Sequence, residues 1–312
     1  FNNLDDRLRH AWELVWPEAK PLLDKELPTL SFASWVGGDR DGHPKVTAMV
    51  TRNTLRTLTQ GAEEVVRSRL VELGQKLAFS RTGLAAPPAL LARLKNWEIP
   101  EDIGEPWKVF VLCIAEHLDE GIEPLRENLE LLISSLVKAG AILTVDLYVR
   151  PVLRLINSFG LHLARLDVRQ NSDAYDLALG QMMEAAGIDD GQNFRQWSLP
   201  RKLEFLNQEL NHPRPMTHAS MELPAEAEEV RATFSELVDH LDARGPEGLG
   251  CLVVSMTRSV ADLLVVCVLG KEVGLTRVRN GEMGCALPVV PLFETYEDLE
   301  AAPGIIDDFL AH

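Results

Sequence analysis

Hydrophobic positions along the chain follow mainly the helical period. From Asn53 to Phe79, apolar residues recur three and four positions apart, which predicts one long amphipathic helix. The same signal predicts further helices at Ser134–Leu147, Asp173–Ala186, Arg201–Leu210 and Ala225–Ala243. Stretches rich in Pro, Gly and Trp predict loops at Thr82–Trp107, Gly187–Pro200 and Asn211–Leu223. The chain is therefore expected to be helix-rich, with about 48–160 and 173–248 mainly helical.

Short apolar runs that interrupt this helical background predict β-strands. They are Leu30–Val36, Leu161–Val168, Cys251–Met256 and Leu287–Leu292. Each run is followed by a polar or glycine-rich turn and then, in most cases, by a helical pattern, as in parallel strands joined by helical crossovers. In such sheets and barrels, chemistry lies at the carboxyl ends of the strands. The residues directly after each run are therefore candidates for a functional site.

Composition narrows the partners that the protein can have. The 312 residues are 46% hydrophobic, which is ordinary for a globular protein, and the formal net charge is −16. An acidic chain repels polyphosphates and anionic membrane surfaces, so neither a nucleic acid nor a membrane partner is expected. The most apolar stretch, 251–270, is interrupted by Arg258 and Asp262, so it does not predict a membrane-spanning helix.

Cysteine usage and the N-terminal sequence bear on the compartment. The four cysteines form no CxxC pair and lie at no zinc-finger spacing, which predicts reduced thiols rather than a disulfide framework. The chain opens without a signal-peptide pattern. A cytoplasmic location is therefore expected. The chain also opens without an initiator Met, which suggests a part of a longer protein.

The turn after the first predicted strand carries unusually dense charge. Asp39, Arg40 and Asp41 are consecutive, and three glycines and a proline constrain the backbone around them. Charges this close must pair with one another or bind a ligand, because an unpaired buried charge is costly. Both a structural ion-pair cluster and a binding site remain open at this point. His43, in the same turn, is interpreted as an exposed loop histidine.

The second strand brings a candidate anion ligand to the same edge. Alternation puts Arg165, Asp167 and Arg169 on one face of the strand. Arg169 lies at the carboxyl end, where a guanidinium can bind a carboxylate or a phosphate through two hydrogen bonds. The alternative is a buried ion pair with Asp167 or Asp39.

The remaining two strands contribute less. Ser255 and Met256 end the third strand and are interpreted as packing residues. Glu294 follows the fourth strand and can ligate a hard cation such as Mg2+ or Mn2+ through oxygen. Such ions need several oxygen ligands, so one carboxylate does not define a site. The strand-end chemistry thus predicts a site for an anionic, metal-chelated ligand and goes no further.

Four segments, in this order, resemble the phosphoenolpyruvate carboxylase family. Residues 34–47 read SWVGGDRDGHPKVT, against the family's S-W-x-G-G-D-R-D-G-N-P-x-V-T. Residues 163–172 match the L-x-x-L-D-I-R-Q-x-S segment with Val168 for Ile, and residues 288–295 match P-V-V-P-L-F-E-T in full. A serine–methionine pair at 255–256 and Asp262 match a third segment weakly.

The resemblance implies a fold and a reaction. The family fold is an eight-stranded β/α barrel overlaid with helices, and these segments look like its second to fifth strands. Residues 1–312 are thus expected to form a single partial-barrel domain with helical insertions. The family enzyme is a lyase that joins bicarbonate to phosphoenolpyruvate with Mg2+ or Mn2+, giving oxaloacetate for the tricarboxylic acid cycle and phosphate. The complete enzyme is expected to be a homo-oligomer.

The resemblance also implies roles for particular residues. Glu294 matches a metal-binding carboxylate, Arg169 matches a substrate-site arginine, and Trp35 matches a residue of a pocket beside the substrate. The supporting turn is matched by Asp39, Arg40 and Asp41.

Other family motifs do not occur in this sequence. They are the T-A-H-P-T-E segment with the catalytic histidine, the H-G-R-G-G phosphate loop, and the G-Y-S-D-S segment with the second metal carboxylate. The leading hypothesis is therefore a fragment of a phosphoenolpyruvate carboxylase that is inactive alone. The alternatives are a truncated non-catalytic paralogue that binds or regulates, and a different metal-dependent barrel enzyme.

Overall fold

The computed structural model describes residues 2–19, 30–43, 45–79, 86–100, 104–212, 214–218, 220–279 and 282–312. The chain divides into two compact units. The helical unit comprises Phe1–Phe32 and Leu58–Ala164, and the sheet unit comprises Ala33–Thr57 and Arg165–His312. The prediction of one domain over 1–312 stays a prediction. Among the described residues, every helix is too short or too polar to span a bilayer.

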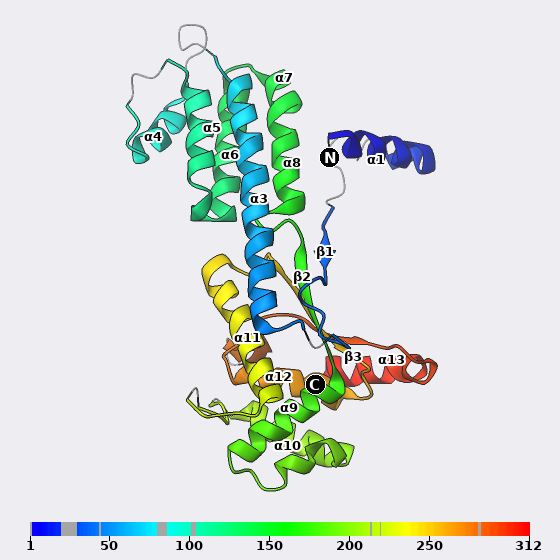
Figure 1. Cartoon of the computed structure of the whole chain (residues 1–312). Helices are drawn as coiled ribbons and strands as arrows, with labels where there is room; N and C mark the ends of the chain where they lie inside the picture. The colour runs from blue at the N-terminus through cyan, green and yellow to red at the C-terminus, as the bar shows by residue number, and fades with distance from the viewer. Residues whose placement is uncertain are drawn as a thin grey trace. The chain divides into compact units, whose positions relative to one another are not determined.

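The helices of the helical unit are α1 (Asn2–Val15), the second part of α3 (Ala48–Lys76), α4 (Pro88–Asn96), α5 (Pro106–Glu116), α6 (Ile122–Lys138), α7 (Ile142–Thr144) and α8 (Arg150–Phe159). Helices α3 to α8 pack around a buried core of leucine and aromatic side chains, to which no described side chain of α1 contributes (Figure 1). Short 3-10 helices at Pro17–Ala19 and Leu118–Glu120 and a π-helical turn at Val145–Val149 join them. Trp107 is fully buried and donates from Nε1 to Ser135 Oγ at 2.9 Å, so its polar atom is satisfied.

The sheet unit is built on four parallel strands in the order β1-β2-β3-β6. The strands are β1 (Ala33–Ser34), β2 (Arg165–Asn171), β3 (Leu249–Ser255) and β6 (Val289–Leu292). Between β2 and β3 lie α9 (Ser172–Ala185), a 3-10 helix (Gly191–Gln196), α10 (Leu199–Asn211) and α11 (Ala225–Arg244). Between β3 and β6 lie α12 (Val260–Lys271) and the hairpin of β4 (Thr276–Arg279) with β5 (Glu282–Cys285), and α13 (Tyr296–Ala311) follows β6.

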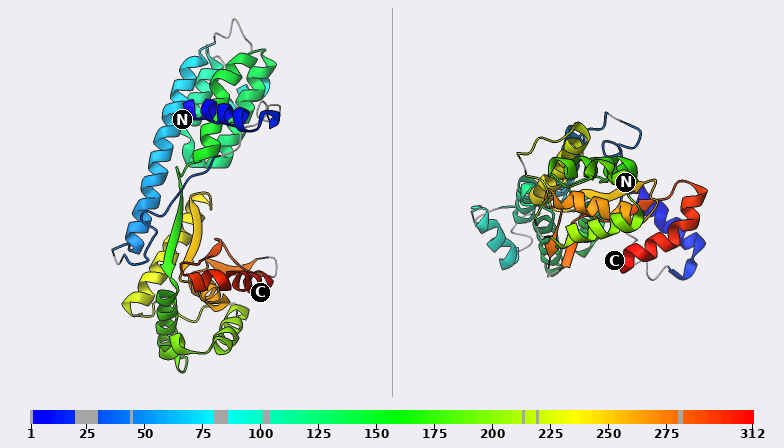
Figure 2. Two further views of the ribbon diagram at one scale, coloured as in Figure 1. Left: turned by 90° about the vertical axis from the view of Figure 1, so that its right-hand side faces the viewer. Right: turned by 90° about the horizontal axis from the view of Figure 1, so that it is seen from below.

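Strand register brings the carboxyl ends of three strands level. Asn171 pairs with Ser255, and Ser255 pairs with Leu292, so β2, β3 and β6 end side by side. Figures 1 and 2 show β2 running directly into α9 at this end. Val168, Leu252 and Val254 of the strands are buried, and α12 is buried along its whole length, so packing holds the strands in this register.

These observations confirm the coarse expectation of a helix-rich α/β protein with parallel strands. The helices predicted from Asn53, Asp173, Arg201 and Ala225 are present as α3, α9, α10 and α11. The first strand is shorter than predicted, because only Ala33 and Ser34 pair with β2.

Two local predictions are wrong. The helix expected over Ser134–Leu147 ends at Lys138, because Gly140 adopts φ +80° and turns the chain. The loop expected over Thr82–Trp107 contains α4 and the start of α5, which begin at Pro88 and Pro106. Proline favours the first turn of a helix, so the residues that suggested a loop mark helix starts. Residues 82–85 and 101–103 lie outside the described residues.

Gly38 allows the turn after β1 to approach β2. A Cβ atom at Gly38 would lie 2.0 Å from the backbone oxygen of Asp167, which cannot move without breaking the sheet. Gly38→Ala is therefore expected to lower the free energy of unfolding by about 2–4 kcal/mol, measured by urea denaturation. Gly304→Ala, in open space on α13, is the control and should raise stability by up to about 1 kcal/mol. Equal stability of Gly38→Ala and the parent would contradict the assigned contact.

Candidate functional site

Side chains from four strand ends meet at the carboxyl edge of the sheet. Arg169 Nη2 donates to Asp41 Oδ2 at 2.8 Å and to Glu294 Oε1 at 2.7 Å. Ser255 Oγ donates to the same Asp41 oxygen at 2.8 Å, and Arg169 Nε lies 3.9 Å from Asp39 Oδ1. These five residues, here called the strand-end cluster, include four of the six predicted site residues: Asp39, Asp41, Arg169 and Glu294.

Backbone hydrogen bonds fix the charged turn against β2. Arg169 N donates to Gly38 O at 3.0 Å, and Arg40 N donates to Arg169 O at 2.8 Å, so the turn continues the parallel pairing. Gly37 adopts φ +85°, which glycine reaches without strain, and its carbonyl accepts from Thr51 Oγ1. Asp41 N donates to Asp39 Oδ1 at 3.0 Å. The turn therefore holds both aspartates beside Arg169.

Arg40 points away from the strand-end cluster. Its side chain is buried, and it donates from Nη1 to Gly38 O at 3.1 Å and from Nη2 to Thr51 Oγ1 at 2.5 Å. Among the described residues, these neutral acceptors are its only hydrogen-bond partners. Arg40 thus braces the turn against α3, as a supporting residue would.

The predicted alternative for Arg169, an ion pair with Asp167 or Asp39, is only partly observed. Asp167 accepts from Cys251 N at 2.9 Å through Oδ1, and the close carboxylates of Arg169 are those of Asp41 and Glu294. Burial lowers the pKa of Arg169, but its bond to Asp41 and the charge of Glu294 outweigh burial and raise that pKa. Burial raises the pKa of Asp41, but bonds from Ser255 and Arg169 outweigh burial and lower it. The charged forms of both residues are therefore favoured.

The cluster carries more negative than positive charge. Asp39, Asp41 and Glu294 surround the single guanidinium of Arg169. The surplus favours an added cation, yet the carboxylates converge on Arg169 and not on a common point. In the part of the chain that the structure describes, no three His, Cys, Asp or Glu side chains are placed to hold a metal ion. Glu294 can supply one ligand, so these residues do not by themselves fit a complete Mg2+ or Mn2+ site.

Apolar side chains are exposed at the same strand ends. Trp35, directly after β1, has 66% of its surface exposed, and Met256, directly after β3, has 37%. Met256 also adopts φ +53°, which is uncommon for a residue with a side chain. The packing role predicted for Met256 stays a prediction, whereas Ser255 is fully buried and bonds Asp41.

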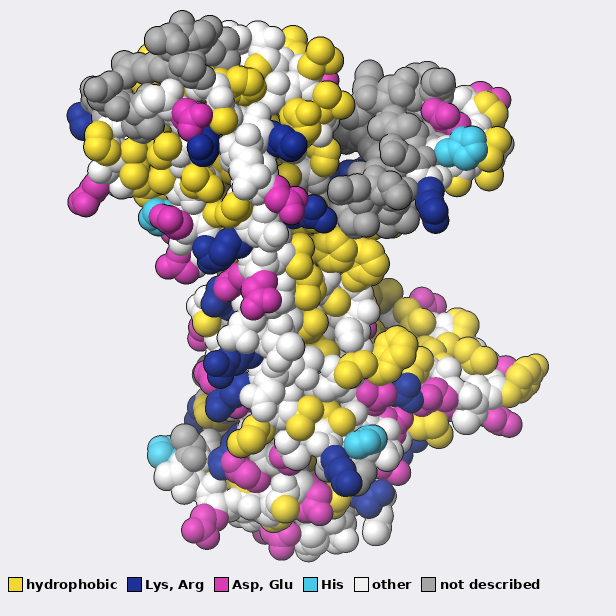
Figure 3. All heavy atoms as spheres, turned by 45° about the horizontal axis from the view of Figure 1, so that its top comes forward, with side chains coloured by type: hydrophobic (Ala, Val, Ile, Leu, Met, Phe, Trp, Pro, Cys, Tyr) yellow, Lys and Arg dark blue, Asp and Glu magenta, His cyan; other side chains and the backbone are white. Residues whose placement is uncertain are grey.

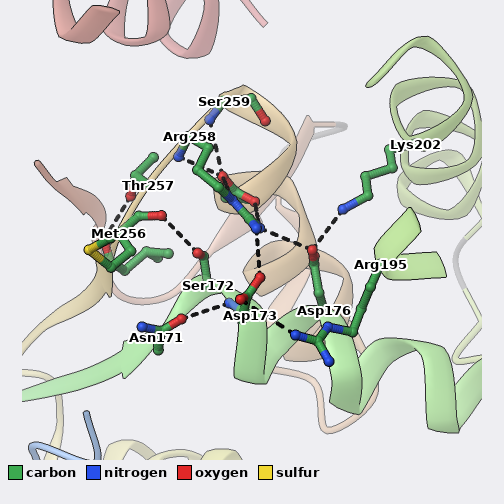
Figure 4. A network of polar contacts seen from close by, with 12 residues as sticks. Asn171, Ser172, Asp173, Asp176, Arg195, Lys202, Met256, Thr257, Arg258 and Ser259 are labelled. Atoms are coloured by element: carbon green, nitrogen blue, oxygen red, sulfur yellow. Dashed lines mark hydrogen bonds and ion pairs between the residues drawn. The ribbon is translucent and has the colours of Figure 1, made fainter. Parts of the chain in front are cut away.

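A second polar network fixes the loop between β3 and α12 (Figure 4). Arg258 donates to Asp173 Oδ1 at 2.6 Å, to Asp262 Oδ1 at 2.8 Å and to Asp176 Oδ2 at 3.1 Å. Asp176 also accepts from Lys202 Nζ at 2.7 Å. The network therefore ties the loop to α9 and α10, and the same loop begins at Ser255 of the strand-end cluster.

The carboxylates of this network are buried and therefore need partners. Asp176 and Asp262 are almost fully buried, and Asp176 Oδ1 has no hydrogen-bond partner among the described residues. Burial raises the pKa of Asp176 and outweighs Lys202, which lowers it. Burial lowers the pKa of Arg258, but Asp262 and the other carboxylates raise it overall. Sequence reasoning missed this network, although two charged residues within an apolar stretch, Arg258 and Asp262, could have indicated a partly buried ion pair.

On the face that Figure 3 shows, acidic and basic side chains are interspersed, and no continuous basic stripe crosses it. The charges that matter at the site are therefore local ones.

Comparison with known sequences identifies the family. The family model described as "Phosphoenolpyruvate carboxylase" matches residues 3–118 and 113–312. The chain belongs to the phosphoenolpyruvate carboxylase family. The resemblance seen in the strand-end motifs is thus confirmed.

Curated relatives agree in identity and in coverage. The phosphoenolpyruvate carboxylase of Rhodopseudomonas palustris is 33% identical over 304 residues, which cover 90% of this chain and 32% of that protein. That of Methylorubrum extorquens is 32% identical over 321 residues, covering 91% and 34%. That of Pseudomonas paraeruginosa is 33% identical over 320 residues, covering 96% and 34%. The chain spans about a third of the length of the curated relatives it matches.

The lowered pKa of Asp41 predicts a pH dependence of stability. Its folded-state pKa lies below the ordinary 3.8, so ionised Asp41 stabilises the fold above about pH 4. That contribution is lost as the pH falls through the folded-state pKa. The stability difference between the parent and Asp41→Asn should therefore shrink from about pH 5 to about pH 2 in urea denaturation. Asp308→Asn, on exposed α13, is the control, and a gap for Asp41→Asn that stays constant across this range would refute the prediction.

Removing Arg258 should deprive buried carboxylates of an ion-pair partner. Arg258→Ala is expected to destabilise the chain by about 1–3 kcal/mol, less than a fully buried pair because the arginine is partly exposed. Arg195→Ala removes a single 3.4 Å contact to Asp173 and should cost below about 0.5 kcal/mol. Urea denaturation of both variants measures the difference. Equal losses would show that Arg258 is a surface ion pair and no more.

Proposed function

We propose that this chain forms part of the substrate site of a phosphoenolpyruvate carboxylase. In that role Arg169 binds phosphoenolpyruvate, and Trp35 lines the pocket beside it. Asp39, Arg40 and Asp41 form the supporting turn. The observation that carries the proposal is the meeting of Arg169, Asp41 and Glu294, from three separate family segments, at one strand-end edge.

The guanidinium of Arg169 is suited to an anionic ligand. Its two carboxylate bonds both leave from Nη2, and Nη1 donates to none of the described residues. The side chain keeps 27% of its surface exposed. An incoming carboxylate or phosphate can therefore bind Nη1 while Asp41 holds the side chain in place.

A metal role for Glu294 belongs to the same proposal. Glu294 would supply one carboxylate to Mg2+ or Mn2+, and the other ligands would come from residues other than those described here. When bound, such a cation would neutralise the charge of phosphoenolpyruvate and of the enolate formed from it. This chain's own residues bind and orient: Arg169 takes the anion, and Asp41 with Ser255 keeps Arg169 in position.

We further propose that the four parallel strands are part of a barrel. The outer strands β1 and β6 of the parallel sheet each have only one partner strand among the described residues. An unpaired edge of a parallel sheet accepts a further strand, and closure of a barrel would pair both edges. The four strands would then be the second to fifth of an eight-stranded β/α barrel. A cytoplasmic, homo-oligomeric complete enzyme is part of this proposal.

The reaction joins phosphoenolpyruvate and bicarbonate to give oxaloacetate and phosphate. The 312-residue chain alone is expected to produce no oxaloacetate, because it offers one metal carboxylate and lacks the family's histidine and phosphate-loop motifs. A coupled assay with malate dehydrogenase and NADH, with phosphoenolpyruvate, bicarbonate and Mn2+, measures this. Turnover by the pure chain, free of other chains, would overturn that expectation.

Mass measurement of the native protein and one substitution complete the test. We expect an active native chain with a mass well above the 34.7 kDa of these 312 residues. In it, Arg169→Gln should lower kcat/KM by about 10² or more, because a charged contact to the substrate is lost. Arg165→Gln, at the other end of β2, is the matched control and should keep activity. Full activity of Arg169→Gln would contradict the substrate role.

A further inference from the structure

A cavity lies behind β2, on the side of the strand away from Arg169. Its walls come from β2, α9, α11 and the charged turn, and its lining includes Arg40, Val168, Tyr175, Glu229, Val230 and Phe234. All of these residues belong to the sheet unit. Along β2, Val168 and Gln170 face the cavity while Arg169 faces the strand-end cluster, as alternation requires. The cavity is thus separate from the proposed substrate site.

The size of the cavity suits a small organic molecule. Its volume is about 240 Å³, and most of its lining is apolar. A dry apolar cavity of about 150 Å³ is large enough to hold benzene. The cavity behind β2 can therefore take one ring, or a branched chain of similar bulk, together with one polar group.

Arg40 is a buried cation without an ion-pair partner on the described residues. Its exposed fraction is 8%, and its hydrogen bonds go to a carbonyl and a hydroxyl, which are both neutral. Burial lowers the pKa of Arg40, and the charge of Glu229 opposes this in part. One oxygen of Glu229 is occupied, because it accepts from Ala48 N at the start of α3. A buried guanidinium that has only neutral hydrogen-bond partners is stabilised by an added anion.

Tyr175 provides a second observation that points to a ligand in this cavity. It is 2% exposed, and its hydroxyl makes no hydrogen bond to any residue in the described ranges. Its ring packs against Phe234 with centroids 6.0 Å apart. Tyr175 lines the cavity, and with no partner on the described residues its hydroxyl is a donor available to a ligand there. Burial raises the pKa of Tyr175, which keeps the hydroxyl protonated and able to donate.

We propose that this cavity binds a small monocarboxylate with a compact apolar body. The carboxylate would face Arg40 and Tyr175, and the apolar body would pack on Val168, Val230 and Phe234. Glu226 and Glu229 also line the cavity, and their charge disfavours a second negative group on the ligand. Phosphoenolpyruvate, which carries a phosphate as well as a carboxylate, is therefore expected to bind here more weakly than a monocarboxylate. Arg40 stands between Asp39 and Asp41, so such a ligand would contact the turn that holds Arg169.

The test uses 3-phenylpropanoate as the probe and the 312-residue chain as the protein. Isothermal titration calorimetry should show saturable binding of one probe per chain. The neutral analogue 3-phenylpropan-1-ol has nearly the same shape and should bind at least about tenfold more weakly, because it carries no charge for Arg40. Equal affinity of acid and alcohol would overturn the proposal, since the cavity would then be merely apolar. Absence of any binding would overturn it too.

Substitutions locate the probe. Tyr175→Phe keeps the ring and should weaken 3-phenylpropanoate binding by about fivefold or more, whereas Tyr148→Phe in the helical unit should leave it unchanged. Ala174→Leu adds bulk to the cavity lining without removing a buried group and should abolish binding. Circular dichroism confirms the fold of each variant, and Ala174→Leu decides the matter if Tyr175→Phe is unstable. Unchanged binding in folded Ala174→Leu would place the probe elsewhere and refute the site.

Discussion

The bond between one guanidinium nitrogen of Arg169 and two carboxylates is the contact on which the site depends. Asp41 and Glu294 lie 128 and 125 positions from Arg169 in the chain, so only the sheet can bring them together. The level carboxyl ends of β2, β3 and β6 do this, and the backbone bonds between the charged turn and β2 add Asp39 and Asp41. Arg169 in turn reduces the repulsion between three carboxylates gathered at one edge.

The same constraint explains what surrounds the cluster. Ser255 bonds Asp41, so the position of the loop after β3 affects Arg169, and Arg258 fixes that loop against α9. On the other side, Arg40 braces the turn from behind β2. The strand-end cluster is thus supported from two directions by charged groups that take no part in it. That arrangement is typical of a site whose central side chain must be held in one orientation.

Sequence patterns were sufficient for the approximate positions of the four parallel strands, for α3, α9, α10 and α11, and for Arg169 and Glu294 as strand-end residues, but not for the β4–β5 hairpin. The alternation of side chains along a strand and the end of an apolar run depend only on neighbouring residues, so both can be read from the sequence. The bond from Ser255 to Asp41, across 214 positions, depends on register, which no local pattern encodes. The Asp173–Asp176–Arg258 network also joins distant segments. The break at Gly140 and the starts at Pro88 and Pro106 were misread because one residue type marks both loops and helix ends.

Membership of the phosphoenolpyruvate carboxylase family and the geometry of the strand ends both support the proposal that Arg169 binds an anion. A crystal structure of the native protein with phosphoenolpyruvate and Mn2+, without bicarbonate, tests this most directly. We expect phosphoenolpyruvate within hydrogen-bond distance of the Arg169 guanidinium, and Glu294 bound to the Mn2+ ion. Phosphoenolpyruvate bound elsewhere, with Arg169 still joined only to Asp41 and Glu294, would contradict the proposal.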